Sequence, residues 1–244
     1  MTFDNVKTIT IGGVAVKKLT LGEKILWEAA SGLLPDEYQR VEYIESTGAQ
    51  YFDTDVNPSN YSDGISYVFR GCFTDFVATG GNNYLFGCLN DGCRSGNISV
   101  LKGTTATSMI VYIGALGNGT YSTSETPLIN TDFEITMTAT SLSIDNFTAS
   151  HNGTAFKRTN ASFTACDMPN ANIYLLQCSG VGANSKPFCG KLYSFSMNTA
   201  DGVPIRNFVP CYRASDSVIG LYDTVEDKFY ENIGTGSFTK GADV

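Results

Sequence analysis

The stretch GKLYSFSMN, Gly190 to Asn198, carries an apolar side chain at every second position. Successive side chains of a β-strand point to opposite faces of a sheet, so Tyr193, Phe195 and Met197 would share one face. Leu192 would lie with the serines on the other face. One face is then apolar throughout, which predicts a strand whose aromatic side faces a core.

The same period of two recurs along the chain in NISVLKG (97–103), MIVYIGAL (109–116) and FEITMTATSLSID (133–145). Gly, Asn, Asp and Ser bound these segments and supply the backbone conformations that hairpin turns need. We find no amphipathic helix longer than a turn or two. The pattern predicts an all-β protein, in the form of an antiparallel two-sheet sandwich or jelly roll.

A domain boundary is expected near EAASGLLP, residues 28–35, where small residues and a proline separate two segments. Residues 1–32 read as a small β unit of three short strands, with turns at Gly12-Gly13 and Gly22-Glu23. So small a unit buries little apolar surface, so we expect it to dock on the main domain, a partner or copies of itself, or simply to extend the large sheet. Residues 33–244 form the jelly-roll domain.

Acidic side chains outnumber basic ones: 24 Asp and Glu stand against 16 Lys and Arg, giving a formal net charge of −8 and a pI near 4.6. Such a surface repels nucleic-acid backbones and anionic lipid heads. We therefore expect neither nucleic acid nor a membrane as a partner. The N-terminal stretch lacks a basic flank followed by a continuous apolar run, so we expect no signal peptide.

Seven cysteines are present, an odd number without any C-x-x-C spacing. We expect free, mostly buried thiols in a reducing cytoplasm rather than a disulfide framework or a zinc site. His151 is the only histidine and directly precedes an Asn-Gly turn. A catalytic triad would have to form on that exposed hairpin tip, so we expect none.

The C-terminal stretch from Val209 to Gly241 holds Cys, Tyr, Arg and Asp side chains close together in sequence. We interpret it as the closing pair of strands, with a turn at residues 225–228. Pro210 lacks an N–H, so the chain should leave the sheet or run along an edge there. We expect Arg213, Asp216 and Asp223 to act as turn formers and ion-pair partners rather than as catalysts.

Two carboxylate pairs occur at alternate positions, Asp53 with Asp55 and Asp132 with Glu134. Each pair would lie on one face of a strand, where it could serve a glycosidase or bind calcium. No cofactor is expected, and calcium is the one metal for which Asp53 and Asp55 are candidates. The alternative is that both pairs lie on solvated strand edges, where charge opposes aggregation.

The segment of residues 78–97 is rich in glycine, amides and charged groups, and loops at the ends of a sandwich are where such folds carry binding sites. A second such segment is CSGVGANSKPFCG, residues 178–190. Thirteen Tyr and fifteen Phe against a single Trp also suit sugar or protein recognition. Six residues of the first segment are candidate ligand contacts: Asn82, Asn83, Tyr84, Asn90, Asp91 and Arg94. The alternative for both segments is ordinary hairpin loops.

LPDEYQRVEYIESTGAQYFDTDVNP (34–58) and the segment of residues 190–241 together resemble concanavalin A-like, laminin-G-like jelly-roll domains of phage and prophage structural proteins from gut Firmicutes. The stretch IGGVAVKKLTLGEKILWEA also looks like the leader that precedes such modules in tail or virion proteins. The resemblance implies two antiparallel sheets in which the first strand of the module lies beside a strand near its end.

The resemblance also implies a virion protein, made in the bacterial cytoplasm and partnered by other virion proteins. A non-enzymatic module that binds a host-surface glycan or protein through the jelly-roll loops is the first interpretation, with the leader as anchor and many copies supplying avidity. A purely structural tail, baseplate or capsid-decoration protein is the alternative, and a homo-oligomer is expected. A glycoside hydrolase is the third possibility and requires a carboxylate pair in a cleft.

Overall fold

A computed structural model of the chain describes residues 34–75, 83–89, 129–137, 169–180 and 187–244 in full. For the remaining strands it describes the backbone. Within these parts nearly all regular structure is β, and the one helix is a 3₁₀ turn, η1, at Pro58–Asn60. No helix in the described part of the chain is long and apolar enough to cross a membrane.

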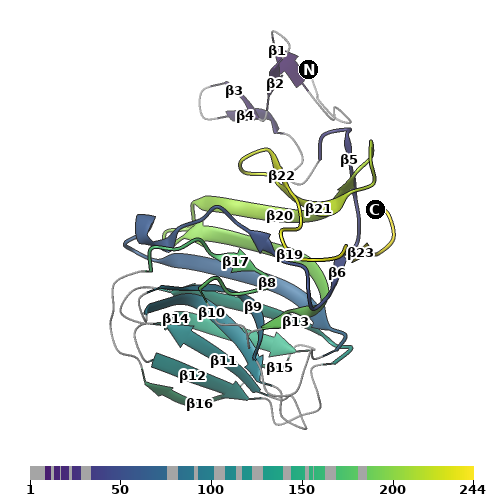
Figure 1. Cartoon of the computed structure of the whole chain (residues 1–244). Helices are drawn as coiled ribbons and strands as arrows, with labels where there is room; N and C mark the ends of the chain where they lie inside the picture. Colours follow the sequence, from purple (N-terminus) through teal and green to yellow (C-terminus); the bar gives the residue numbers. More distant parts are fainter. Residues whose placement is uncertain are drawn as a thin grey trace.

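Two large sheets make up the main domain (Figure 1). The larger sheet contains, in spatial order, β15 (Thr154–Ala155), β14 (Ile144–His151), β13 (Asp132–Ala139), β8 (Ile65–Phe73), β19 (Cys189–Thr199), β20 (Pro204–Arg213), β21 (Ile219–Asp223) and β22 (Lys228–Tyr230). Three further strands join it at the side of β19 and β20: β5 (Tyr38–Arg40), β6 (Ile44–Thr47) and β23 (Thr239–Lys240).

The smaller sheet contains, in spatial order, β16 (Lys157–Ser162), β12 (Gly117–Ser122), β11 (Ser108–Ile113), β10 (Cys93–Leu101), β9 (Asn82–Asn90), β17 (Tyr174–Leu175) and β7 (Phe52–Asp53). The short strand β18 (Lys186–Pro187) adds to β9 in parallel, and every other strand pair in both sheets is antiparallel. The all-β, two-sheet jelly-roll sandwich predicted from the alternation is confirmed.

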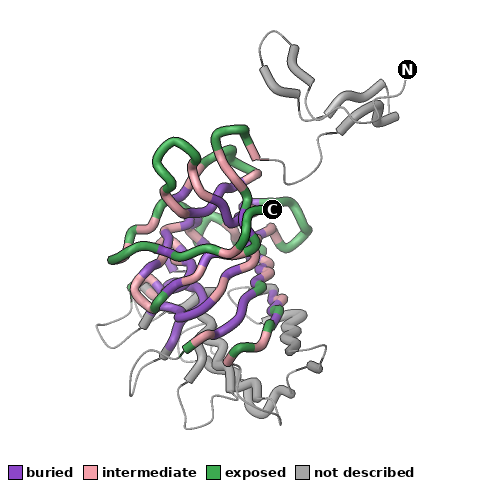
Figure 2. The backbone as a smooth tube through the Cα atoms, turned by 90° about the vertical axis from the view of Figure 1, so that its right-hand side faces the viewer, coloured by how far each residue is buried: buried purple, intermediate pink, exposed green. Residues whose placement is uncertain are grey.

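Aromatic side chains join the two sheets. Phe86 of the smaller sheet lies with its ring centroid 5.0 Å from those of both Tyr67 and Phe195 of the larger sheet. Phe195 in turn contacts Phe69 and Phe208, and all of these side chains are buried. Figure 2 shows buried backbone positions running through the interior of the domain and exposed positions on its outside. The core is therefore a continuous aromatic stack between the sheets.

A β-bulge in β19 corrects the predicted assignment of faces. The pairing of β19 with β8 shifts register between Leu192 and Ser194, so one residue is inserted opposite β8. Leu192 therefore shares the fully buried face with Phe195 and Met197, while Tyr193 is partly exposed. Strict alternation, which placed Tyr193 in the core, was wrong because it cannot register an inserted residue.

The beginning and the end of the main domain lie side by side, as the resemblance implies (Figure 1). Strand β6 pairs with β19 on one side and with β23 near the C-terminus on the other. An isolated bridge joins Val41 to Asp243, and the Val41 N–H donates to the Pro210 carbonyl at 3.0 Å. This expectation is confirmed.

The strand β20 does not leave the sheet at Pro210, which pairs opposite Leu221 of β21. On its other side the neighbour changes: pairing with β19 ends at Phe208, and pairing with β5 begins at Cys211. On that side Pro210 has no strand partner, so the N–H that proline lacks is not needed for a hydrogen bond between strands. The edge expected from the proline is confirmed in this restricted form.

The closing hairpin and its charges follow the prediction. Strands β21 and β22 pair across a turn at residues 224–227. Arg213 forms an ion pair with Asp216 at 2.7 Å and another with Glu231 at 2.9 Å. The hydrogen bonds from the Arg213 guanidinium, and then the one from the Val218 N–H, hold the pKa of Asp216 below its ordinary value. Asp223 accepts the Val225 N–H at 3.0 Å and so caps the turn.

In the N-terminal unit, four strands replace the three that were predicted. β1 (Ile9–Ile11) pairs with β2 (Val14–Val16), and β3 (Lys18–Leu21) pairs with β4 (Lys24–Glu28). The segment of residues 14–21, predicted as one strand, forms two strands, because β2 pairs with β1 and β3 pairs with β4. Docking of this unit depends on side chains outside the described residues, so both docking and the boundary near residue 32 stay predictions.

Five cysteines lie in the fully described part, and all are buried and outside disulfide bonds: Cys72, Cys88, Cys178, Cys189 and Cys211. Burial raises the pKa of Cys211 to about 12, so its thiol stays protonated at neutral pH. For these five, the expectation of buried thiols outside disulfide bonds is confirmed. Cys93 and Cys166 lie outside the fully described residues.

Phe195→Ala should lower the free energy of unfolding by about 3–5 kcal/mol, because it removes a ring that contacts both sheets. The neighbouring Ser196→Ala, on the opposite face, should change it by less than about 0.5 kcal/mol. Urea denaturation followed by far-UV circular dichroism measures both. Similar losses in the two variants would show that Phe195 does not join the sheets as described.

Candidate functional site

The segment of residues 78–97, predicted to bind through loops, is mostly a β-hairpin. Strands β9 and β10 pair directly, with Asn90 opposite Cys93. Asn83 and Tyr84 are buried in β9, at 0% and 8% exposure. Neither offers a surface to a ligand, because β9 is a central strand covered on both faces, which the glycine-rich sequence did not indicate.

The other four candidates in this segment are Asn82, Asn90, Asp91 and Arg94. Their side chains lie outside the described residues, so ligand contact by them stays a prediction. The second segment, residues 178–190, is partly sheet: β18 pairs with β9, and Phe188 and Cys189 are buried. His151 ends β14, opposite Thr154 across the predicted turn, and its side chain is likewise outside the described residues.

Asp53 and Asp55 do not share a strand face. Strand β7 ends at Asp53, and Asp55 adopts a left-handed backbone conformation with φ of 56°. The Asp53 carboxylate accepts hydrogen bonds from the Asn172 amide at 3.0 and 3.2 Å, whereas Asp55 forms an ion pair with Lys228. The prediction that the two carboxylates share one strand face is therefore wrong, and calcium binding by these residues stays a prediction. The described residues contain no group of three or more metal-ligating side chains.

Asp132 and Glu134 do share the exposed face of β13, as predicted. Asp132 accepts a hydrogen bond from the Tyr193 hydroxyl at 2.7 Å, and Glu134 lies 3.6 Å from Arg70. The strand is not an edge, however, because β8 and β14 flank it. Each carboxylate serves a contact across the outer face of the larger sheet.

A buried charged cluster joins β20 to the closing turn. Arg206, 7% exposed, donates to the Thr54 carbonyl at 3.1 Å and lies 2.6 Å from Glu226. Its Nε lies 3.5 Å from Asp223, which is fully buried and accepts the Asn207 N–H at 2.8 Å. These groups are used in mutual contacts, so we assign the cluster to structure rather than to chemistry.

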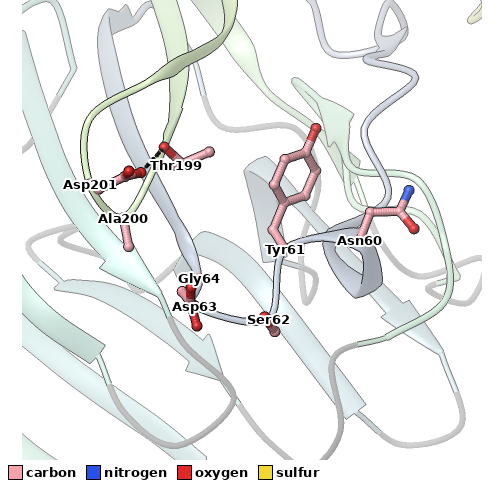
Figure 3. A pocket seen from close by; sticks show the side chains of 8 residues that line it. All are labelled: Asn60, Tyr61, Ser62, Asp63, Gly64, Thr199, Ala200 and Asp201. Carbon is pink, nitrogen blue, oxygen red and sulfur yellow. Dashed lines mark hydrogen bonds between the residues drawn. The ribbon is translucent and has the colours of Figure 1, made fainter.

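A surface pocket among the described residues lies where two turns meet at one end of the sandwich, and we call it the loop pocket. It has a volume of about 320 Å³. Its lining consists of Asn60, Tyr61, Ser62, Asp63, Gly64, Thr199, Ala200 and Asp201. Figure 3 shows the residues of the β19–β20 turn on one side and Asn60 with the Tyr61 ring on the other.

Local hydrogen bonds fix both turns of the loop pocket. Asn57 caps η1 by accepting the Ser59 N–H at 3.0 Å, and the Gly64 N–H donates to the Tyr61 carbonyl at 3.0 Å. In the opposite turn, the Val203 N–H donates to the Thr199 hydroxyl oxygen at 2.9 Å. The pocket is thus largely preformed, which lowers the entropic cost of binding a ligand.

The polar groups of the loop pocket face solvent. Asn60, Ser62, Asp63 and Asp201 are exposed, and Thr199 donates its hydroxyl hydrogen bond to Asp201 (Figure 3). Carboxylates accept hydrogen bonds, whereas amides and hydroxyls both donate and accept them, so this set can bind a ligand rich in hydroxyl groups. A glycosidase also needs one carboxyl group kept protonated by an apolar environment, and exposed Asp63 and Asp201 lack that environment.

Sequence reasoning missed the loop pocket. Each of its two turns can be predicted from the sequence, in NPSNYSDG (57–64) and in TADG (199–202). They lie far apart in the chain, however, and only the sheet order brings β8 next to β19 and so their turns together.

No protein-family model matches this chain, and no curated protein sequence matches it either. Similar solved structures include the native heptameric SAP-like pentraxin from Limulus polyphemus, at 9% identity and a TM-score of 0.49, covering 84% of this chain and 94% of that one. Domains LG4-5 of the mouse laminin α1 chain are similar at 11% identity and a TM-score of 0.45, covering 82% of this chain and 50% of that one. Both similarities concern the fold alone.

Arg206→Met should destabilise the fold by about 3–5 kcal/mol, because it leaves the fully buried Asp223 without its cation. Arg70→Met removes an exposed ion pair and should cost much less. Urea denaturation at pH 7 compares the two. Equal and small losses would mean that the cluster contributes little to stability, and would reopen a functional role for Asp223 and Glu226.

Proposed function

We propose that this chain is a non-catalytic binding module of a phage or prophage particle that recognises a host-surface glycan through the loop pocket. The observation that carries the binding role is the preformed pocket of about 320 Å³, which is lined by exposed amide, hydroxyl and carboxylate groups together with Tyr61. Sugars are bound by such polar groups together with an aromatic ring. The virion setting rests on the sequence resemblance of residues 34–58 and 190–241.

The shallowness of the pocket is compatible with this role. A single shallow site binds weakly, but a particle that carries many copies gains avidity without any new contact. The acidic surface, with a net charge of −8, favours a ligand recognised by hydrogen bonds over one attracted by long-range charge. A neutral, hydroxyl-rich glycan meets both conditions.

Binding to a glycan array and to candidate host cells, with and without calcium, tests the proposal. The double variant Asn60→Ala, Asp63→Ala should weaken binding at least about tenfold, because it removes two polar contacts. Asp36→Ala, an exposed carboxylate outside the pocket, should bind like the parent protein. Thermal unfolding of all three proteins checks that they are folded.

Three results would overturn the proposal. Unchanged binding in the double variant would move the site elsewhere. A well-folded protein that binds no glycan and no host cell would favour the structural virion role, for which light scattering should then show a homo-oligomer. Release of reducing sugar from a bound glycan would make the chain a glycoside hydrolase. Binding lost on removal of calcium would identify the ion as part of the site.

A further inference from the structure

A second pocket lies on the outer face of the larger sheet, where β19 and β20 separate, and we call it the fork pocket. It has a volume of about 180 Å³ and is lined by Arg40, Tyr193, Ser194 and residues 207–210. It shares no residue with the loop pocket. Its size, below the roughly 300–1,000 Å³ of drug-sized sites, suits one chemical group or one sugar ring.

The way the strands pair in this sheet explains why a pocket forms here. β19 pairs with β6 as far as Leu192 and with β20 only from Phe195 onward. The two residues between them include the bulged Tyr193. On the facing strand, Pro210 occupies the gap between the β19 and β5 pairings. A bulge and a proline thus hold the sheet open at one place.

Arg40 lines this pocket. Four arginine side chains are described, and Arg70, Arg206 and Arg213 each lie within 3.6 Å of a carboxylate. Among the described residues, the exposed Arg40 guanidinium forms no hydrogen bond or ion pair. In a chain with 24 acidic and 16 basic side chains, an arginine left unpaired at a pocket is an available anion receptor.

Neutral polar groups surround Arg40. The Asn207 amide nitrogen donates to Thr224 at 2.8 Å, and among the described residues its side-chain oxygen accepts no hydrogen bond, so it is available as an acceptor. Ser194 has an uncommitted hydroxyl among the described residues. Tyr193 donates to Asp132 at 2.7 Å and keeps its oxygen lone pairs, since burial and then that hydrogen bond raise its pKa and keep it protonated. Donors and acceptors for hydroxyl groups thus lie beside a single cation.

We propose that the fork pocket binds an acidic sugar residue, with Arg40 holding its carboxylate and Ser194 and Asn207 contacting its hydroxyl groups. One guanidinium matches one carboxylate in charge and in its two parallel hydrogen bonds, whereas a phosphate carries more charge than a lone arginine balances. The hydroxyl and amide groups fit a sugar better than an apolar acid. This site is independent of the loop pocket.

Titration of the full chain by isothermal calorimetry with methyl glucuronide, methyl galacturonide and the methyl glycoside of N-acetylneuraminic acid tests the inference. At least one should bind, and its neutral counterpart (methyl glucoside, methyl galactoside or the methyl ester of the sialoside) should bind at least about tenfold more weakly. Arg40→Gln should weaken the affinity for the acidic sugar at least about tenfold, and Arg40→Lys should retain only part of the parent affinity. Arg70→Gln, on the same face but paired with Glu134, should stay within about twofold of the parent.

The inference is overturned if none of the three acids binds, if the neutral counterpart binds equally well, or if Arg40→Gln leaves binding unchanged in a folded protein. A glutamate peptide or inorganic phosphate that binds more tightly than the sugars would also overturn it, in favour of a peptide or phosphate site. The Asn60→Ala, Asp63→Ala variant should still bind the acidic sugar. Its failure there, with Arg40→Gln unaffected, would place that sugar in the loop pocket instead.

Discussion

The backbone pairing of β19 with β8 is the interaction on which the rest of the larger sheet depends. β8 accompanies β19 from Gly190 to Thr199, whereas the other side of β19 is divided between β6 and β20. Because the bulge at Tyr193 lies where that division occurs, a single inserted residue sets which side chains enter the core and where the sheet opens. The aromatic stack around Phe195 and the fork pocket on the opposite face are two results of the same irregularity.

Local pattern predicted much of this fold, since alternation and turn residues are properties of neighbouring positions. The strand at residues 189–199, the closing hairpin and the meeting of the domain ends all follow from the sequence or the resemblance. Alternation failed at Leu192, where the bulge exchanges the faces, and in the 14–21 segment, where one expected strand is two. Such shifts depend on the partner strand, which a short stretch of sequence does not contain.

The candidate sites were harder to predict because they arise from contacts between distant segments. Asn83 and Tyr84 stand in a polar, glycine-rich stretch typical of a loop, yet the central position of β9 buries them. Asp53 and Asp55 alternate in sequence, but the backbone turns at Asp55 and separates them. Only the pair at Asp132 and Glu134 keeps the predicted common face, because a continuous strand preserves the period of two.

The pairing of β6 with β23, and of Val41 with Asp243, also has a consequence for how the chain reaches this structure. The first strands of the main domain find neighbours at the far end of the same domain. On the ribosome, the backbone groups of β5 stay unpaired until β20 has emerged, and those of β6 until β19 and β23 have emerged. Contacts between residues so far apart in the sequence slow folding, so the sandwich should close late and in one step. Until then, the unpaired strand edges of the nascent chain are exposed to aggregation.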